Sequence, residues 1–346
     1  MSLFGFQNNT SVEGQVNNSR IALVDALKGF AIILVVVGHA LQINLLDFDN
    51  NIFFRIIYSF HMPLFMFLSG FVAFNILKLP SFTFVRKKFL CLVVPFLAWY
   101  FLDYFIKGAY HFTGFWAYWM KLFFSPDFGL WFLWVLFLNF CCLLVAIKLE
   151  KKIGIVSYFL LILLIELSPY RFLGIGLLKW HSIYFFIGYL SRVFANFFKK
   201  YLFHLSLVSL VLFPILVSLW HRTNHYFFLE KIFGFVNFNQ SFYIPQLLAF
   251  AFIILTAFSG IGFSYFIINI LKKNIIFNFL KWLSSYSLDI YVLHFYFLLR
   301  LGSNMFLILF SVVTSLFCSI VISRFFLRKV SILDIIFLGG RKKIIS

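Results

Sequence analysis

Apolar runs long enough to cross a lipid bilayer recur along most of this chain, from about residue 21 to residue 327. A helix needs roughly 20 apolar residues to span the hydrocarbon core. Hydrophobic residues make up 63% of the 346 positions and charged residues 12%, against about 25% charged residues in a soluble domain. One packed core cannot hide that much apolar surface, so the sequence predicts an all-α, polytopic transmembrane helix bundle.

Windows of about 19 residues predict about ten spans, of which the fifth is the shortest. The expected spans are Ile21–Leu41, Ile52–Leu77, Phe89–Ile106, Leu130–Ile147, Ile153–Leu167, Leu173–Val193, Leu202–Trp220, Pro245–Ile268, Trp282–Leu299 and Met305–Leu327.

The distribution of basic residues tests this assignment independently. If the N-terminus is cytoplasmic, 21 of the 29 Lys and Arg residues fall in cytoplasmic connections or tails, and eight fall on the other face. Each predicted cytoplasmic connection is richer in basic residues than its neighbours, as the positive-inside rule expects. Both termini are therefore predicted to be cytoplasmic.

The chain reads as one membrane domain with two tails. Residues 1–19 are polar and Asn-rich and lack the basic start of a cleavable signal peptide. Residues 20–330 form the expected transmembrane domain, and 331–346 a basic cytoplasmic tail. The net charge of +18 is spread over short clusters between apolar segments, which argues for contact with lipid headgroups and against nucleic acid. The four cysteines lie inside apolar runs, and no metal site is expected.

The first span carries Asp25, Lys28 and His39 in an otherwise apolar run. Charged groups in a membrane span cost on the order of 3 kcal/mol each, so they indicate function by default. Lys28 and His39 are about three helical turns apart, on one face and about 16 Å apart along the axis. Asp25 shares that face, three positions before Lys28. This stripe favours a lined polar cavity. The alternatives are an interfacial Asp25–Lys28 pair and an interfacial His39.

The second span contains His61, Pro63 and Ser69. Pro63 removes a helical hydrogen bond and frees a carbonyl, which membrane helices tolerate where protein or water satisfies it. His61 lies near the middle of the bilayer, and Ser69-Gly70 allows close helix packing. The segment is either part of a substrate or proton-handling site or a structural kink.

Further candidates lie in later spans. Tyr291 and His294 share one face of the ninth span, as a second proton relay or as hydrogen-bonded packing residues. Trp131, near the start of the fourth span, is a candidate for substrate contact, with packing as the alternative. The chain has no GxSxG, P-loop, HExxH or CxxC motif. Histidine is therefore the most available general base.

Two long outer connections, 103–129 and 221–244, are rich in aromatic residues and histidine. They are either an interfacial aromatic belt or a sugar-binding surface that faces the periplasm.

Several of these segments resemble, in order, the landmarks of the acyltransferase family 3 membrane proteins. That family begins with a basic residue, ten intervening residues and a histidine, which Lys28 and His39 match. The segments 60–71, 130–133, 185–189 and 290–294 are similar to later landmarks, so the likeness covers roughly residues 20 to 300. Members often carry two arginines three apart before the third span. Here residues 86–91 read Arg-Lys-Lys-Phe-Leu-Cys, and the second position falls on Cys91.

The resemblance implies transfer of an acetyl or other acyl group from cytoplasmic acetyl-CoA to a hydroxyl group on the far side of the membrane. His39 would deprotonate that hydroxyl or briefly carry the acetyl group, Lys28 would hold CoA or orient the site, and Asp25 would position Lys28. Phosphate contact would fall to the basic cluster Arg86, Lys87 and Lys88.

The acceptor expected from the resemblance is a cell-surface glycan or glycolipid, such as lipopolysaccharide O-antigen, capsule, exported oligosaccharide or peptidoglycan. The expected location is the bacterial inner membrane, with the oligomeric state open. The rival interpretation is a transporter or flippase for a lipid-linked glycan, in which the membrane histidines form a proton relay.

Overall fold

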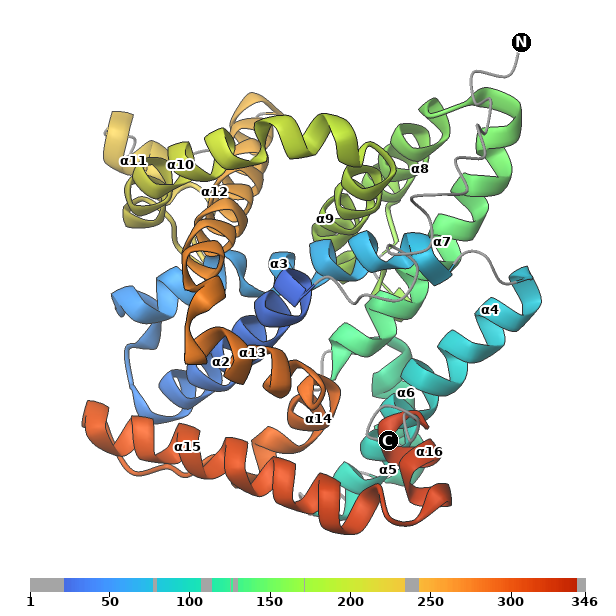
Figure 1. Cartoon of the computed structure of the whole chain (residues 1–346), viewed down its shortest axis with the longest axis vertical. Coiled ribbons are helices and arrows are strands. Elements are labelled where there is room, and N and C mark those ends of the chain that lie inside the picture. The colour runs from blue at the N-terminus through green and yellow to red at the C-terminus, as the bar shows by residue number, and fades with distance from the viewer. Residues whose placement is uncertain are drawn as a thin grey trace.

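The computed structural model describes residues 22–340 except 77–79, 107–113, 125, 127–129, 171 and 234–242. The expected tail 1–19 and the last residues of the basic tail, 341–346, lie outside the described residues. In these ranges every regular element is helical (Figure 1). The elements are α2 (Ala22–Asn44), η1 (Phe48–Asn50), α3 (Ile52–Ile76), α4 (Ser81–Lys88), η2 (Phe89–Val93), α5 (Val94–Ile106), α6 (Phe115–Phe124), α7 (Trp131–Ile153), α8 (Val156–Leu167), η4 (Phe172–Gly174), α9 (Ile175–Val193), α10 (Ala195–Ser218), α11 (Phe227–Phe233), α12 (Tyr243–Ile270), η5 (Leu271–Lys273), α13 (Ile275–Ser284), α14 (Ser287–Phe297), α15 (Met305–Ile322), η6 (Ser323–Leu327) and α16 (Ser331–Leu338).

Eight helices in the described ranges are long and apolar enough to cross a membrane, which confirms an all-α polytopic bundle. The other two predicted spans are shorter. The fifth is α8, whose 12 residues cover about 18 Å, against a hydrocarbon core of about 30 Å. The ninth is not one helix but the pair α13 and α14. The total of about ten spans and the cytoplasmic position of the termini stay predictions.

The break between α13 and α14 is stabilised from a distant part of the chain. Arg328 donates from Nη2 to the carbonyl of Ser285 at the break (3.2 Å). The same guanidinium binds Asp289 in α14 at 2.7 and 2.8 Å, with both side chains almost fully buried. Broken helices persist in membranes where protein or water satisfies the freed backbone groups. The segment after α15 therefore fixes the two half-helices.

The helices α3 and α9 cross in the middle of the bundle through paired glycines (Figure 1). A Cβ atom on Gly70 would lie 1.9 Å from the carbonyl oxygen of Phe185, and one on Gly188 would lie 2.1 Å from that of Phe67. Without a driving force from water, membrane helices associate by such close backbone approach at small residues. The expected role of Gly70 in close packing is thus confirmed.

Connections predicted on one side of the membrane meet at one end of the bundle, which we call the outer end. Arg222, after α10, binds Asp49 in η1 through contacts of 2.6 and 2.9 Å, and this bond holds the pKa of Asp49 below its ordinary value. Asn44, at the end of α2, accepts from the N–H groups of Leu301 and Gly302 at 2.7 and 3.0 Å. The opposite end is the inner end.

We predict that Gly70→Val destabilises the folded protein, because the added carbons collide with the Phe185 backbone and overpacking of this kind costs about 1–3 kcal/mol or more. The apparent melting temperature in detergent, followed by size-exclusion chromatography, should fall by several degrees. Gly114→Val is the matched control, since nothing in the described part of the chain lies within 4 Å of its Cβ position. Equal melting temperatures for both variants would contradict the glycine crossing.

Candidate active site

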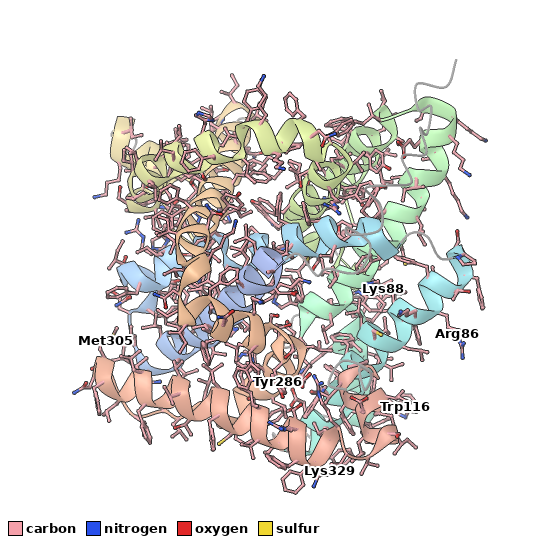
Figure 2. The ribbon with its side chains drawn as sticks, in the orientation of Figure 1. Arg86, Lys88, Trp116, Tyr286, Met305 and Lys329 are labelled. Carbon is pink, nitrogen blue, oxygen red and sulfur yellow. The ribbon has the colours of Figure 1, made fainter. Side chains whose placement is uncertain are left out.

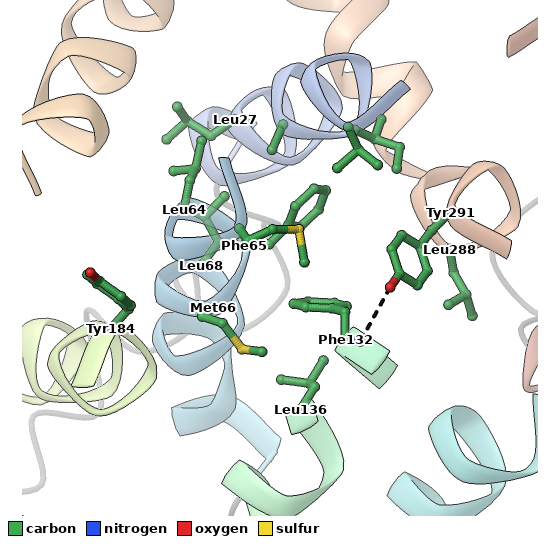
Figure 3. Close-up of a cluster of buried hydrophobic side chains, with 14 of the residues drawn as sticks. Leu27, Leu64, Phe65, Met66, Leu68, Phe132, Leu136, Tyr184, Leu288 and Tyr291 are labelled. Atoms are coloured by element: carbon green, nitrogen blue, oxygen red, sulfur yellow. Dashed lines mark hydrogen bonds between the residues drawn. The ribbon is translucent and has the colours of Figure 1, made fainter. Parts of the chain in front are cut away.

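Five helices close a ring around a common interior, and we call them the helix ring. The helix α2 packs on α3, α3 on α9, α9 on α7, and α14 on α2. The ring is completed between α7 and α14, where the Phe132 N–H donates to the hydroxyl oxygen of Tyr291 at 3.3 Å (Figure 3).

Histidines and one tryptophan gather near the outer end of this ring. The imidazoles of His39 and His294 have centroids 5.3 Å apart, and the ring centroids of His181 and Trp131 are 4.7 Å apart. His61 lies within range of electrostatic interaction with both His39 and His181. All five residues lie in the half of their helix nearer the outer end. We call the four histidines the imidazole layer.

An apolar layer follows toward the inner end on the same helices. Figure 3 shows it through Leu27 of α2, Leu64 of α3, Tyr184 of α9 and Leu136 of α7, all buried. On α2 the apolar residue precedes the histidine in sequence, whereas on α3 and α9 it follows. That order matches helices that run in alternating directions through a membrane, so the imidazole layer occupies one level of the bundle.

Three of the four imidazoles are held by their own helices. In each, Nδ1 must donate because its partner is a backbone carbonyl, which only accepts. The bonds run from His61 to Ile57 (2.8 Å), from His181 to Leu177 (2.8 Å) and from His294 to Ile290 (3.0 Å). The proton on Nδ1 leaves Nε2 of each of these rings as the unprotonated acceptor.

His39 is oriented by side chains instead. Its Nδ1 lies 3.1 Å from the amide oxygen of Gln42 and 3.2 Å from the hydroxyl of Tyr58, which itself donates to Gln42 at 2.9 Å. An amide oxygen accepts only, so Nδ1 of His39 carries the proton and Nε2 keeps its lone pair. A base or nucleophile needs that arrangement.

His39 and its neighbour His294 differ in how far they are exposed. His39 is partly exposed, whereas His294 is fully buried. The Nε2 atom of His294 is buried and, among the described residues, has no hydrogen-bond partner. Of these two rings, His39 is therefore the partly exposed one, and His294 is an acceptor packed beside it.

Lys28 and Asp25 lie on α2 as predicted, on the same continuous helix as His39 and about 16 Å inward of it in the case of Lys28. Both side chains are partly buried. At the next residue, Gly29, a Cβ atom would lie 1.9 Å from the carbonyl oxygen of Leu280. The half-helix α13 thus crosses α2 directly beside Lys28.

The basic cluster lies at the end of α4, which packs on α7 rather than on α2. Arg86 and Lys87 are exposed, and Figure 2 shows Arg86 projecting from the outside of the bundle. Lys88 is partly buried, and its Nζ lies 3.7 Å from the centroid of the Phe140 ring on α7. Cys91, at the position where family members often have a second arginine, donates to the carbonyl of Gly339 (3.2 Å).

The remaining candidates divide between the site and its surroundings. Tyr291 links α14 to α7, and Ser69 is partly buried beside the glycine crossing. In the first long outer connection α6 holds Tyr118, which is buried and stacks on Tyr100 with centroids 4.5 Å apart. Trp116 on the same helix is 79% exposed and lies at the edge of the bundle (Figure 2). Residues 107–113 of this connection lie outside the described residues.

Sequence reasoning did not find three residues of the site: Gln42, Tyr58 and His181. The sequence contained a signal for Gln42 and Tyr58. Gln42 lies three positions after His39 and Tyr58 three positions before His61, so each shares a helical face with that histidine. His181 had none, since only the packing of α9 against α7 brings it to Trp131.

Comparison with known proteins identifies the fold family. The family model described as an acyltransferase domain, that of acyltransferase family 3, matches residues 21–326. The chain belongs to acyltransferase family 3. The family match includes every residue of the imidazole layer, together with Lys28 and the basic cluster on α4.

Two curated proteins are similar to about half of this chain. It is similar to the nodulation protein NolL of Sinorhizobium fredii (34% identity over 185 residues) and to NolL of Mesorhizobium japonicum (30% over 187 residues). Each alignment covers 50% of this chain and 49% or 48% of the relative. The chain thus spans about half the length of the curated relatives it matches. No solved structure matches it.

We predict that Gln42→Leu lowers acyl-transfer activity by about 10²-fold, because the His39 imidazole loses the acceptor that holds its orientation, and small misplacements of a catalytic group cost this much. Gln42→Glu, which keeps an acceptor oxygen, should retain much more activity. The measurement is kcat and donor KM for both variants at matched amounts of folded protein. Equal loss in the two variants would contradict an orienting role for the Gln42 oxygen.

Proposed function

We propose that this protein is an integral membrane O-acetyltransferase, which moves an acetyl group from cytoplasmic acetyl-CoA to a hydroxyl of a cell-surface glycan or glycolipid. The observation that carries the proposal is His39, partly exposed and held by Gln42 so that its Nε2 lone pair stays available. Membership of acyltransferase family 3 supplies the reaction class.

His39 acts as the general base. Its Nε2 takes the proton of the acceptor hydroxyl while the hydroxyl oxygen attacks the thioester carbonyl. The carbon–sulfur bond then breaks, and the imidazolium returns the proton to the departing CoA thiolate, so that the products are an acetyl ester and free CoA. A two-step variant, with the acetyl group carried briefly on Nε2, uses the same lone pair.

The positions of Lys28 and His39 along α2 support an approach of the acyl donor and the glycan acceptor from opposite sides of the membrane. Lys28 lies toward the inner end and His39 toward the outer end of one helix, and the predicted cytoplasmic side is the inner one. Lys28 would hold the anionic part of CoA, with Asp25 positioning its ammonium group. Arg86, Lys87 and Lys88 would meet the CoA phosphates where they enter.

The acceptor class rests on the predicted sidedness. A glycan or glycolipid outside a bacterial inner membrane, such as lipopolysaccharide O-antigen, would reach the imidazole layer from the outer end. The partly exposed Trp131 and His181 line this level of the ring, and an indole face beside an imidazole suits a sugar.

We predict that His39→Ala abolishes transfer of labelled acetyl groups from acetyl-CoA to glycan in membrane extracts, because no other described imidazole near it is both partly exposed and oriented by side chains. The matched control is His204→Ala, which removes an exposed histidine from α10, outside the helix ring. Transfer that continues unchanged in His39→Ala would rule out the role of His39. Wild-type protein that never consumes acetyl-CoA would favour a glycan transporter instead.

A further inference from the structure

Asn139 is a polar residue in the middle of α7 that the proposed chemistry does not use. Its side chain is fully buried. The amide nitrogen donates to the carbonyl of Val135 at 3.0 Å, which leaves the Oδ1 oxygen as the free end of the group. This oxygen is buried and has no hydrogen-bond partner among the described residues.

The position of Asn139 on α7 directs it to the interior of the helix ring. It follows Phe132 by seven positions and Leu136 by three, so the three side chains share one face. Phe132 and Leu136 are buried in the interior that Figure 3 shows, and Leu143, four positions further, is also buried. Asn139 is therefore an amide acceptor set into the apolar layer, about 10 Å inward of Phe132 along the helix.

A buried acceptor without a donor is unfavourable in any protein and more so inside a membrane domain. It becomes favourable when a ligand brings an N–H or O–H group. The neighbouring residue indicates which ligand: the ammonium of Lys88 lies 3.7 Å from the ring centroid of Phe140. An anionic group bound at Lys88 would thus lie close to the level of Asn139.

The polar groups therefore fall on two levels. The ammonium of Lys88 and the Asn139 oxygen lie toward the inner end, and the imidazole layer with His39 lies further outward. An acyl-CoA carries matching groups, with phosphates and an amide-bearing arm on one side and the thioester at the other end.

We propose that Oδ1 of Asn139 accepts a hydrogen bond from an amide N–H of the pantetheine arm of the acyl donor. This inference rests on the proposed function and names a binding residue for its donor. The amide concerned is the one farther from sulfur, because only two methylene groups separate sulfur from the nearer amide, which stays beside the imidazole layer.

The test replaces one N–H group of the acyl donor, which is the group that would donate the hydrogen bond. Acetyl-CoA is compared with an analogue in which the farther amide N–H is replaced by an ester oxygen, so that the hydrogen bond is lost and the rest of the donor is kept. Wild-type protein should use the ester analogue with kcat/KM about five- to tenfold lower, the value of one hydrogen bond. Asn139→Leu should be slower with acetyl-CoA and use both donors equally within about twofold.

Two controls keep the result specific. Asn139→Ala gives the same comparison with less added bulk, in case the leucine side chain prevents folding. Ser157→Ala removes another fully buried oxygen without a described partner, on α8 outside the helix ring, and should keep the wild-type preference for the amide.

The inference is overturned if wild-type protein uses the two donors equally, or if the Asn139 variants still prefer the amide. A wild-type protein that transfers no acetyl group from acetyl-CoA contradicts the proposed function itself, which separates the two failures.

Discussion

The need of each imidazole Nδ1 for a hydrogen-bond partner within the protein is the constraint on which the site depends. Hydrocarbon offers no partner to a polar group, so an imidazole in this bundle has to be satisfied by protein. His61, His181 and His294 meet that need within one helical turn. Each bond fixes a ring and turns its second nitrogen into an acceptor. Within the imidazole layer, His39 is the one ring that uses side chains for this purpose.

This difference in the partners of Nδ1 sets His39 apart from the other three histidines. His61 and His294, whose rings are tied to their own helices, are buried, whereas His181 is tied in the same way and is partly exposed. His39 is held from one side by Gln42 and Tyr58 and stays partly exposed. The helix ring then separates two polar levels, Lys28 and Lys88 toward the inner end and the imidazole layer toward the outer end, with apolar packing between them. Asn139 is a polar group set into that packing.

Features that depend on a single helix can be predicted from the sequence. The register of Lys28 and His39 follows from helical periodicity, and α2 is continuous over both residues. Partners from other helices are harder to predict. The break at Ser285 has no proline or glycine to mark it, and the arginine that stabilises it lies 43 positions later. The short α8 was predicted as a span because its composition is apolar, although it was already the shortest of the predicted spans. The positions of His181 and Asn139 in the site can be recognised only when the packing of the five ring helices is known.

The central claim is that the chain passes an acetyl group between two faces of a membrane. Purified protein in sealed vesicles of known orientation tests it, with labelled acetyl-CoA supplied on one side only and a glycan acceptor on the other. The account predicts labelled glycan when acetyl-CoA meets the face of the α4 basic cluster, and none when both reagents are exchanged. Equal labelling in both arrangements in intact vesicles, or transfer only when both reagents share one face, would contradict it.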